Sequence, residues 1–436
     1  MSQQSNQPGV QPLSITKKQW EINGRDLLKN LSKAAFNAIA QNWIGAATDL
    51  VEVGAAVSWG SSEAEMAWRL IYESLGQATL ALLEDNRDLL VYDDQRLDTD
   101  LLALSEQVDL SLGQTELVLD NYFFKNPKQS PVLEAIKPAL VQWLGRLVRE
   151  PQQAGIMAAR LPAYFVYALH NEWRQNAKDY AVLKERLDTP FIQAAEREQG
   201  WALYGAWLQK KVEEPMFLEA FGLKQVYVPL CAYYRQNKQP SGDKLEDGRM
   251  QGREESKRVV VELEGCLNQW LKQGDRTDAI RLISGGPGSG KSSFTKMWAA
   301  QLAEEGEVPT LYVPLHLIDA TKDLIEAVGE FVAIAELLQH NPLAPETGES
   351  RLLLIFDGLD ELAMQGKLGA EAAQAFVKEV QTKVNQFNVQ KTKLQVLMSG
   401  RESSSASQRR YVSEARSNTT FMPLFCARVG TRKLPG

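Results

Sequence analysis

Apolar residues recur at helical spacing through the first half of the chain, from residue 15 to residue 222. Two sets show the pattern: Leu28, Leu31, Ala35 and Ile39, and then Trp68, Ile71, Leu75, Ala78 and Leu82. Steps of three and four residues place side chains on one face of an α-helix. The second set follows Ser62 and Glu65, which have the spacing of a capping box. We therefore predict an all-helical domain over residues 15–222, preceded by a polar, disordered leader over residues 1–14.

A further helix is expected to begin at Ser130-Pro131, since proline is favoured in the first turn. Its apolar side continues past an expected kink at Pro138 and takes in Trp143, Leu144, Leu147 and Val148. His170 is the only histidine of this region, so we interpret it as a packed residue rather than a metal ligand. The acidic stretch at residues 93–100 is interpreted as a solvated loop. The sequence therefore does not reveal what the helical domain does.

From residue 223 the helical spacing gives way to short apolar runs. Residues 225–230 predict an edge strand, and the polar, Pro-, Gly- and charge-rich residues up to 258 predict a linker. Residues 259–271 are interpreted as a helix that leads into an α/β domain over residues 259–436. Strands are expected at 280–284, 310–315, 352–356, 394–398 and 419–425, with helices at 293–302 and 322–338. Such alternation predicts a three-layer P-loop-type domain, with a parallel sheet covered by helices on both faces.

Composition and charge narrow the class of protein. The chain has 436 residues, of which 44% are hydrophobic and 24% charged, and this is typical of two or three globular domains. A net charge of −7 argues against a general nucleic-acid-binding surface. Three scattered cysteines form neither a disulfide framework nor a zinc site, which favours a cytoplasmic location. The most apolar stretch, residues 36–59, is interrupted by polar side chains, so we predict a core helix and no membrane span.

The clearest candidate for chemistry is a glycine-rich loop between the strand at 280–284 and the helix at 293–302. Its nucleotide-binding residues are Gly285, Gly286, Pro287, Gly288, Ser289, Gly290, Lys291, Ser292 and Ser293. Glycines let backbone N–H groups surround a polyphosphate, and the helix N-terminus adds partial positive charge. Lys291 is expected to reach the β/γ-phosphates and the Ser292 hydroxyl to bind Mg²⁺. A glycine turn with this spacing by coincidence is the alternative, which the flanking strand and helix disfavour.

Carboxylates follow the fully apolar strand at 352–356. Ligands of open α/β sheets bind at the carboxyl ends of strands, so Asp357 is expected to hold Mg²⁺ directly or through water. Glu361 is our candidate for the group that orients or deprotonates the attacking water, with Asp360 in reserve. Arg401, which follows the strand at 394–398, is a candidate for sensing the γ-phosphate. Taken singly, these residues also fit an acidic helix cap and a surface arginine; their order along the chain gives them their weight.

Three segments together resemble a known family: GGPGSGKSS, LLLIFDGLDEL and VLMSGR. The set is similar to the NACHT family of STAND-class P-loop ATPases, the switch domain of Nod-like receptors and of their bacterial relatives. The resemblance covers roughly residues 225–425. It implies Walker A and Walker B motifs, ATP and Mg²⁺ as ligands, and slow hydrolysis coupled to a switch that is closed with ADP and oligomerises with ATP. It also implies an unknown protein trigger, an N-terminal output domain and, for bacterial members, antiphage defence.

The sequence departs from this family after Arg401, where 35 residues remain. That is too short for the winged-helix and sensor domains that the resemblance implies, so we expect a C-terminally truncated chain, a fragment, or completion by another chain. Two other functions stay open: a remodelling ATPase of the AAA type, and a non-catalytic helical scaffold with a vestigial nucleotide site. A remodelling ATPase is expected to hydrolyse many ATP molecules per minute, whereas a switch should be nearly idle. A titration with ATP and Mg²⁺ that shows no binding would favour the scaffold. The trigger, the oligomeric state and the preference for ATP over GTP are not readable from the sequence.

Overall fold

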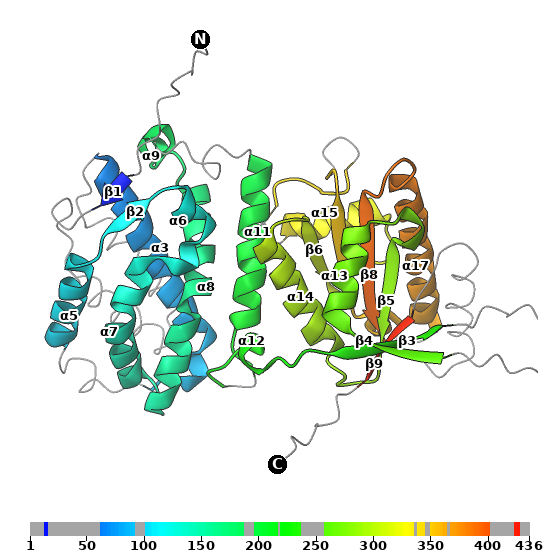
Figure 1. Cartoon of the computed structure of the whole chain (residues 1–436), viewed down its shortest axis with the longest axis horizontal. Helices are drawn as coiled ribbons and strands as arrows, with labels where there is room; N and C mark the ends of the chain where they lie inside the picture. The colour runs from blue at the N-terminus through cyan, green and yellow to red at the C-terminus, as the bar shows by residue number, and fades with distance from the viewer. Residues whose placement is uncertain are drawn as a thin grey trace, which may run out of the picture. The chain divides into compact units, whose positions relative to one another are not determined.

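The computed structural model describes ten ranges of the chain: residues 13–15, 62–91, 101–186, 196–216, 219–236, 257–334, 338–344, 349–363, 367–401 and 423–427 (Figure 1). The chain divides into two compact units, Met1–Val226 and Tyr227–Gly436. The first is mainly helical and the second contains the larger sheet, which confirms the predicted class of a helical region followed by an α/β region.

The first unit is built from α-helices of very different lengths. They are α3 (Glu63–Asp85), α5 (Leu101–Gly113), α6 (Asn121–Lys125), α7 (Pro131–Leu147), α8 (Pro151–Gln175), α9 (Ala181–Arg186), α11 (Glu196–Glu213) and α12 (Leu223–Val226), with short 3₁₀ turns η2 (Arg87–Leu89) and η3 (Pro127–Gln129). The unit is not all-helical as predicted, because β1 (Leu13–Ile15) pairs antiparallel with β2 (Leu117–Leu119). Strand β1 also overlaps the end of the predicted leader. The partner strand is about a hundred residues away, so no local periodicity signals this pairing.

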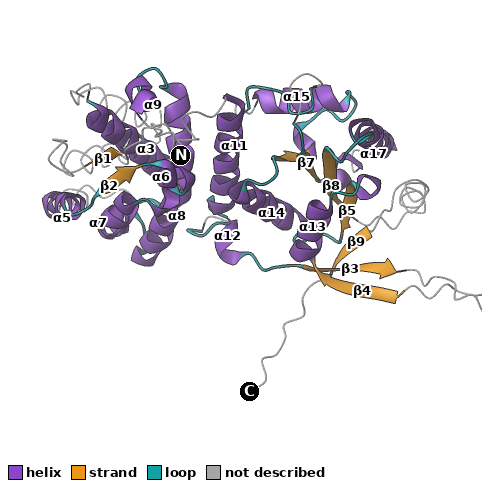
Figure 2. Ribbon diagram, turned by 45° about the horizontal axis from the view of Figure 1, so that its top comes forward, coloured by secondary structure: helices purple, strands orange, loops and turns teal. Residues whose placement is uncertain are grey.

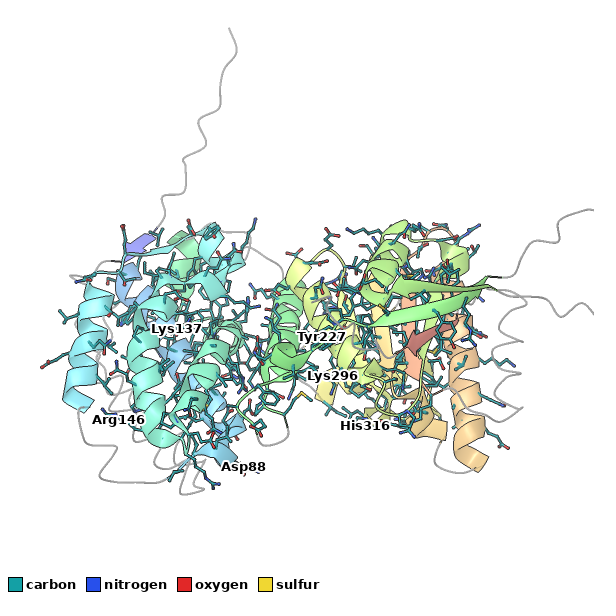
Figure 3. The ribbon with its side chains drawn as sticks, turned by 60° about the horizontal axis from the view of Figure 1, so that its bottom comes forward. Asp88, Lys137, Arg146, Tyr227, Lys296 and His316 are labelled. Carbon is teal, nitrogen blue, oxygen red and sulfur yellow. The ribbon has the colours of Figure 1, made fainter. Side chains whose placement is uncertain are left out.

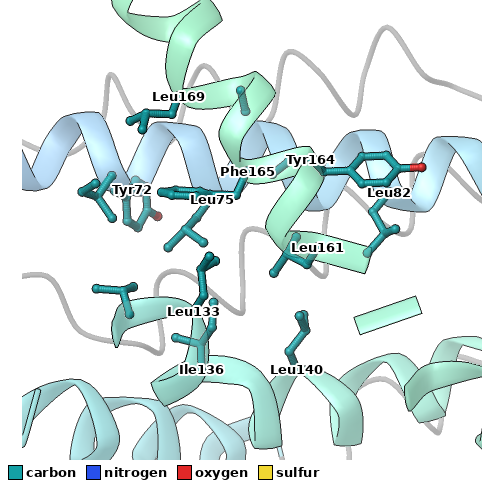
Figure 4. Packing of buried hydrophobic residues seen from close by; sticks show 14 of the residues in the cluster. Tyr72, Leu75, Leu82, Leu133, Ile136, Leu140, Leu161, Tyr164, Phe165 and Leu169 are labelled. Carbon is teal, nitrogen blue, oxygen red and sulfur yellow. The ribbon is translucent and has the colours of Figure 1, made fainter. Parts of the chain in front are cut away.

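Helix α3 shows why this part of the chain folds as the sequence predicts. The Glu65 backbone N–H donates to Ser62 Oγ at 3.3 Å, and the Ser62 N–H donates to Glu65 Oε2 at 3.1 Å, which completes the capping box. All five apolar residues predicted for its inner face are buried. They contribute to a core shared with α7 and α8, where Leu75, Leu133 and Leu161 meet (Figure 4). The first predicted set, at residues 28–39, lies outside the described residues.

The start of α7 and its buried side follow the prediction. The helix begins at Pro131 and runs through Pro138 to Leu147. Trp143, Leu144, Leu147 and the capping Val148 are all buried. Pro138 is exposed and lies outside the buried stripe of the helix. Proline has no backbone N–H, so it cannot donate the hydrogen bond that this helical position would otherwise make.

The second unit contains a sheet with helices around it. Its elements are β3 (Cys231–Gln236), β4 (Lys257–Glu262), α13 (Leu263–Gln273), η4 (Arg276–Asp278), β5 (Ile280–Ser284), α14 (Lys291–Glu305), β6 (Thr310–Pro314), η5 (Leu315–Leu317), α15 (Leu324–Ile334), β7 (Leu352–Asp357), α16 (Leu359–Ala363), α17 (Lys367–Phe387), β8 (Leu394–Gly400) and β9 (Pro423–Ala427). The order of the described strands is β4-β3-β9-β5-β8-β7-β6. Figure 2 shows the part of this order from β4 to β7. Neighbours from β9 to β6 are parallel, whereas β3 runs antiparallel to both β4 and β9.

Burial confirms the parallel α/β arrangement. Every residue of β7 and of β8 is buried, so both faces of these central strands are covered. Helices α14 and α17 lie on opposite sides of the strands (Figures 1 and 2). In chain order β6 and β7 follow β5, yet β8 is inserted between β5 and β7 in the sheet. The carboxyl ends of β5, β8 and β7 therefore lie side by side.

Two predictions near the start of this unit are wrong. The edge strand expected at 225–230 is absent: residues 223–226 form α12, residues 227–230 have no regular structure, and the strand begins at Cys231. The helix expected at 259–271 begins only at Leu263, because residues 257–262 form β4. Three consecutive valines, Val259 to Val261, favour extended backbone. Pairing with β3 supplies their ladder, and the Glu262 carboxylate then caps α13 by accepting from the backbone N–H of Gly265 at 2.6 Å.

Within the described residues, no helix has both the length and the apolar character needed to cross a bilayer. The apolar stretch at residues 36–59 lies outside them.

Candidate functional site

The glycine-rich loop joins the end of β5 to the start of α14, as the sequence predicts. Gly288 and Gly290 have φ angles of +66° and +86°, which side chains other than glycine rarely adopt. A Cβ added at Gly286 or Gly288 would meet no atom within 4 Å, so one side of the loop is open. A Cβ at Gly290 would lie 3.3 Å from Leu230, which places the segment before β3 against the loop.

Lys291 is buried at the base of this loop, with 9% relative exposure. Its Nζ donates to the carbonyl oxygens of Gly285 at 2.8 Å and Gly286 at 3.0 Å, and to Ser289 Oγ at 3.3 Å. A buried ammonium needs such acceptors, because removing it from water costs several kcal/mol. The loop therefore holds a positive charge beneath its own backbone.

The N-terminus of α14 faces the same loop. Its N-cap is Gly290, which offers no side-chain cap, and its first turn contains no acidic residue. The early N–H groups and the helix dipole therefore remain available to an anion. Ser292 is exposed and Ser293 half-buried at this end of the helix.

Asp357 ends β7 and is buried between two hydroxyl donors. Tyr312 Oη on β6 donates to Asp357 Oδ2 at 3.0 Å, and Ser399 Oγ on β8 donates to Asp357 Oδ1. Ser399 Oγ also accepts from the Gly358 backbone N–H at 3.4 Å. The carboxylate is thus fixed by one side chain from each flanking strand.

A backbone contact brings the loop and this carboxylate to one edge of the sheet. The Gly285 N–H donates to the Gly400 carbonyl at 3.3 Å, and Ser284 pairs with Gly400 in the β5–β8 ladder. Gly400 is the neighbour of Ser399, which holds Asp357. Lys291 and Asp357 are therefore joined through the ends of three adjacent strands, although no direct bond links them.

The acids after Asp357 have separate partners. Asp360 Oδ2 forms an ion pair with Arg401 Nε at 2.7 Å, and Asp360 is the less exposed of the two side chains. Glu361 Oε2 lies 3.3 Å from His316 Nδ1 on η5. Arg401 and the two acids thus meet at the same edge of the sheet, with Arg401 engaged by Asp360.

Sequence reasoning missed three members of this cluster: Tyr312, Ser399 and His316. Tyr312 stands within an apolar strand, where a tyrosine is ordinarily a packing residue. Ser399 directly precedes Gly400 and Arg401, so its polar character at the end of a buried strand was the available signal. His316 carries no sequence signal, because only the sheet order places η5 beside α16.

The residues present fit a nucleotide with Mg²⁺. An open glycine loop, a buried ammonium and an uncapped helix N-terminus suit a polyphosphate. Among the described residues no three His, Cys, Asp or Glu side chains are grouped to hold a metal. This is compatible with Mg²⁺, which is commonly held by one or two protein groups together with substrate phosphates.

The structure also describes the histidine of the first unit and two of the cysteines. His170 is buried in α8 of the first unit, and burial lowers its pKa to about 4, in line with a packed neutral imidazole. Cys231 and Cys266 are free thiols. The acidic stretch at 93–100 lies outside the described residues.

Comparison with known proteins bears on the first unit. Residues 15–223, a little under half of the chain, match the family model described as NACHT N-terminal Helical domain 3. No curated protein matches. A chain of the solved E. coli MS115-1 HORMA:CdnC:Trip13 complex matches with 15% identity and a TM-score of 0.21, over 36% of this chain and 55% of that chain. A TM-score this low carries no structural argument. The family match concerns the helical region alone: residues 15–223 are similar to this N-terminal helical domain, which supports a NACHT-family protein.

Proposed function

We propose that this chain is a NACHT-type signalling switch that binds ATP with Mg²⁺ and hydrolyses it slowly. The observation that carries the proposal is the junction of β5, β8 and β7. There the loop around Lys291 and the buried Asp357 meet at one sheet edge through Gly400 and Ser399. The match of residues 15–223 to a helical domain named for its place before NACHT modules supports the same conclusion independently.

The residues divide the chemistry among them. Residues 285–293 bind the phosphates, with the Lys291 ammonium exchanging loop carbonyls for phosphate oxygens. Ser292 and Asp357 hold Mg²⁺, which supplies charge neutralisation at the phosphates when bound. Glu361 orients or deprotonates the attacking water. We assign it this role over Asp360, because the Glu361 side chain is the more accessible of the two, at 56% exposure against 17%, and Asp360 is paired with the arginine.

The switch part of the proposal extends the family resemblance. We propose that ATP favours an oligomerising state and ADP a closed one, with a protein trigger acting on the change. For such a role we expect turnover to be nearly idle in the isolated chain, unlike that of a remodelling ATPase. A role in antiphage defence is part of the same proposal.

The first test is equilibrium binding of ATP and Mg²⁺ by calorimetry. Lys291→Ala should weaken ATP binding at least about a hundredfold, because a charge-assisted contact to phosphate is lost. Lys296→Ala is the matched control, since Lys296 is an exposed lysine of the same helix (Figure 3). Equal affinity of Lys291→Ala and wild type would reject the site.

Hydrolysis is the second arm of that experiment. Glu361→Gln should bind ATP as tightly as the wild type but lower turnover by about a hundredfold or more. Full activity of Glu361→Gln would reject its catalytic role while leaving the binding site intact.

A further inference from the structure

His316 and Glu361 form a pair that connects two adjacent strand ends. His316 follows β6 by two residues and Glu361 follows β7 by four, and the strands are paired up to Pro314 and Asp357. Nδ1 and Oε2 are 3.3 Å apart. A carboxylate can only accept, so Nδ1 must carry a hydrogen for the two atoms to attract each other.

The Glu361 carboxylate also lies close to the Gly358 turn. Gly358 has a φ angle of +92°, and a Cβ added there would lie 3.1 Å from Glu361 Cδ. The Glu361 N–H donates to the Gly358 carbonyl at 2.8 Å, which closes the turn. A Cβ at Gly358 would also lie 3.2 Å from Oε2, so the oxygen that faces His316 is also the one that lies against the glycine turn.

The pair contributes little to folding. Both side chains are more than half exposed, at 59% for His316 and 56% for Glu361. Exposed ion pairs stabilise proteins by at most about 1 kcal/mol. The effect of the contact is instead geometric, because it restricts the rotamers of the flexible Glu361 side chain.

The two acids of α16 are held by opposite neighbours. Asp360 pairs with Arg401 after β8, and Glu361 pairs with His316 after β6. Glu361 thus has a partner other than the arginine, and its second carboxylate oxygen is not the one that faces His316. An oriented base with a free oxygen is what activation of a water requires.

We propose that His316 is a positioning residue for the Glu361 carboxylate in ATP hydrolysis. This inference rests on the proposed function, since it assumes that Glu361 acts on the attacking water. His316 does not contact the phosphates in this scheme; it raises the fraction of time that Glu361 spends in a productive rotamer. Its loss should therefore change turnover and leave nucleotide binding unchanged.

The experiment is steady-state ATP hydrolysis by the full chain, with wild type, Lys291→Ala, Glu361→Gln, His316→Ala and His316→Asn. His316→Ala should lower kcat roughly tenfold at unchanged KM and unchanged melting temperature. His316→Asn should restore most of kcat, because the asparagine amide N–H lies where Nδ1–H does. His340→Ala is the control for loss of a histidine–glutamate pair elsewhere in the same unit, since His340 pairs with Glu349 at 3.1 Å, although this pair is much less exposed, at 14% and 8%.

The outcomes separate the two proposals. Turnover that depends on Lys291 and Glu361 but is unchanged or raised in His316→Ala would overturn the role of His316 alone. Equal losses in His316→Ala and His316→Asn, or an equal loss in His340→Ala, would overturn it too. Turnover that is absent, or unaffected by Lys291→Ala, would overturn the proposed function and the role of His316 with it.

Discussion

Lys291 and Asp357 are buried charges that are stabilised by neutral partners. Lys291 is bonded to two carbonyls and a hydroxyl, and Asp357 to two hydroxyls. Neutral acceptors compensate a buried ammonium less well than an anion does. A phosphate that replaced the loop carbonyls would therefore be a better partner for Lys291, and we expect this difference to favour nucleotide binding.

Glu73 on α3 offers a prediction about pH. Burial, and after it the charge of Glu172 on α8, raise its pKa from 4.5 to about 7, while Arg69 acts in the opposite direction. Between about pH 4.5 and pH 7, Glu73 therefore keeps a proton in the folded state that it has released in the unfolded chain. The stability this provides is complete below about pH 4.5 and is lost as the pH rises to about 7.

Glu73→Gln should remove this dependence. We expect the variant to be more stable than the wild type at pH 8 by about 1–3 kcal/mol, and indistinguishable from it near pH 4.5. Urea unfolding of both proteins between pH 4.5 and 8 measures the difference. A stability gap that does not change with pH would contradict the raised pKa.

At the scale of elements, central strands were easier to predict than peripheral ones. The apolar run at 352–356 is buried on both faces as β7, so its sequence alone carries the signal. Strand β4 is different: the run of valines at 259–261 is followed almost directly by the amphipathic helix α13. The spacing of apolar residues therefore predicted one continuous helix over both segments. Its identity depends on β3, which lies some twenty residues earlier across a polar stretch.

The candidate site divides in the same way. Lys291, Asp357 and the acids of α16 belong to local motifs and could be found from the sequence. Tyr312, Ser399 and His316 reach the site only because β8 lies between β5 and β7 and because β6 lies beside β7. Sheet order is a long-range property, which the spacing of residues along the chain does not encode.

The turn between β7 and α16 allows a prediction at this scale. Gly358→Ala should cost about 1–2 kcal/mol of stability for the positive φ angle. It should also displace the Glu361 carboxylate, which a Cβ would approach to 3.1 Å, and so lower turnover. Gly306→Ala is the control: Gly306 has a φ of +67° at the end of α14, but nothing lies within 4 Å of an added Cβ.

Thermal unfolding followed by activity assays distinguishes the two effects. Both variants should lose similar stability, whereas only Gly358→Ala should lose turnover at temperatures where it is folded. Equal activity of the two variants would show that the Glu361 rotamer does not depend on Gly358.

At the scale of the whole molecule, the chain has two cores. Arg160 on α8, whose side chain is fully buried, links several segments of the first unit. Its Nη1 donates to the Ala220 carbonyl at 2.7 Å and to Asn86 Oδ1 at 2.9 Å, its Nη2 to Tyr164 Oη at 3.1 Å, and its Nε to the Glu213 carbonyl. The guanidinium therefore ties the end of α11 and the following segment to α3 and α8.

Two cores predict two unfolding transitions, because domains with separate cores commonly unfold as separate cooperative units. Arg160→Ala leaves buried carbonyls without a donor and should destabilise the first unit by more than about 2 kcal/mol. ATP with Mg²⁺ at a hundred times its Kd should instead stabilise the second unit by about 2.7 kcal/mol. Differential scanning calorimetry should show the substitution lowering one transition and the nucleotide raising the other, with the exposed Arg149→Ala as control. A single transition that both changes move would mean that the two units unfold together, so that ligand binding in the second unit would also stabilise the first.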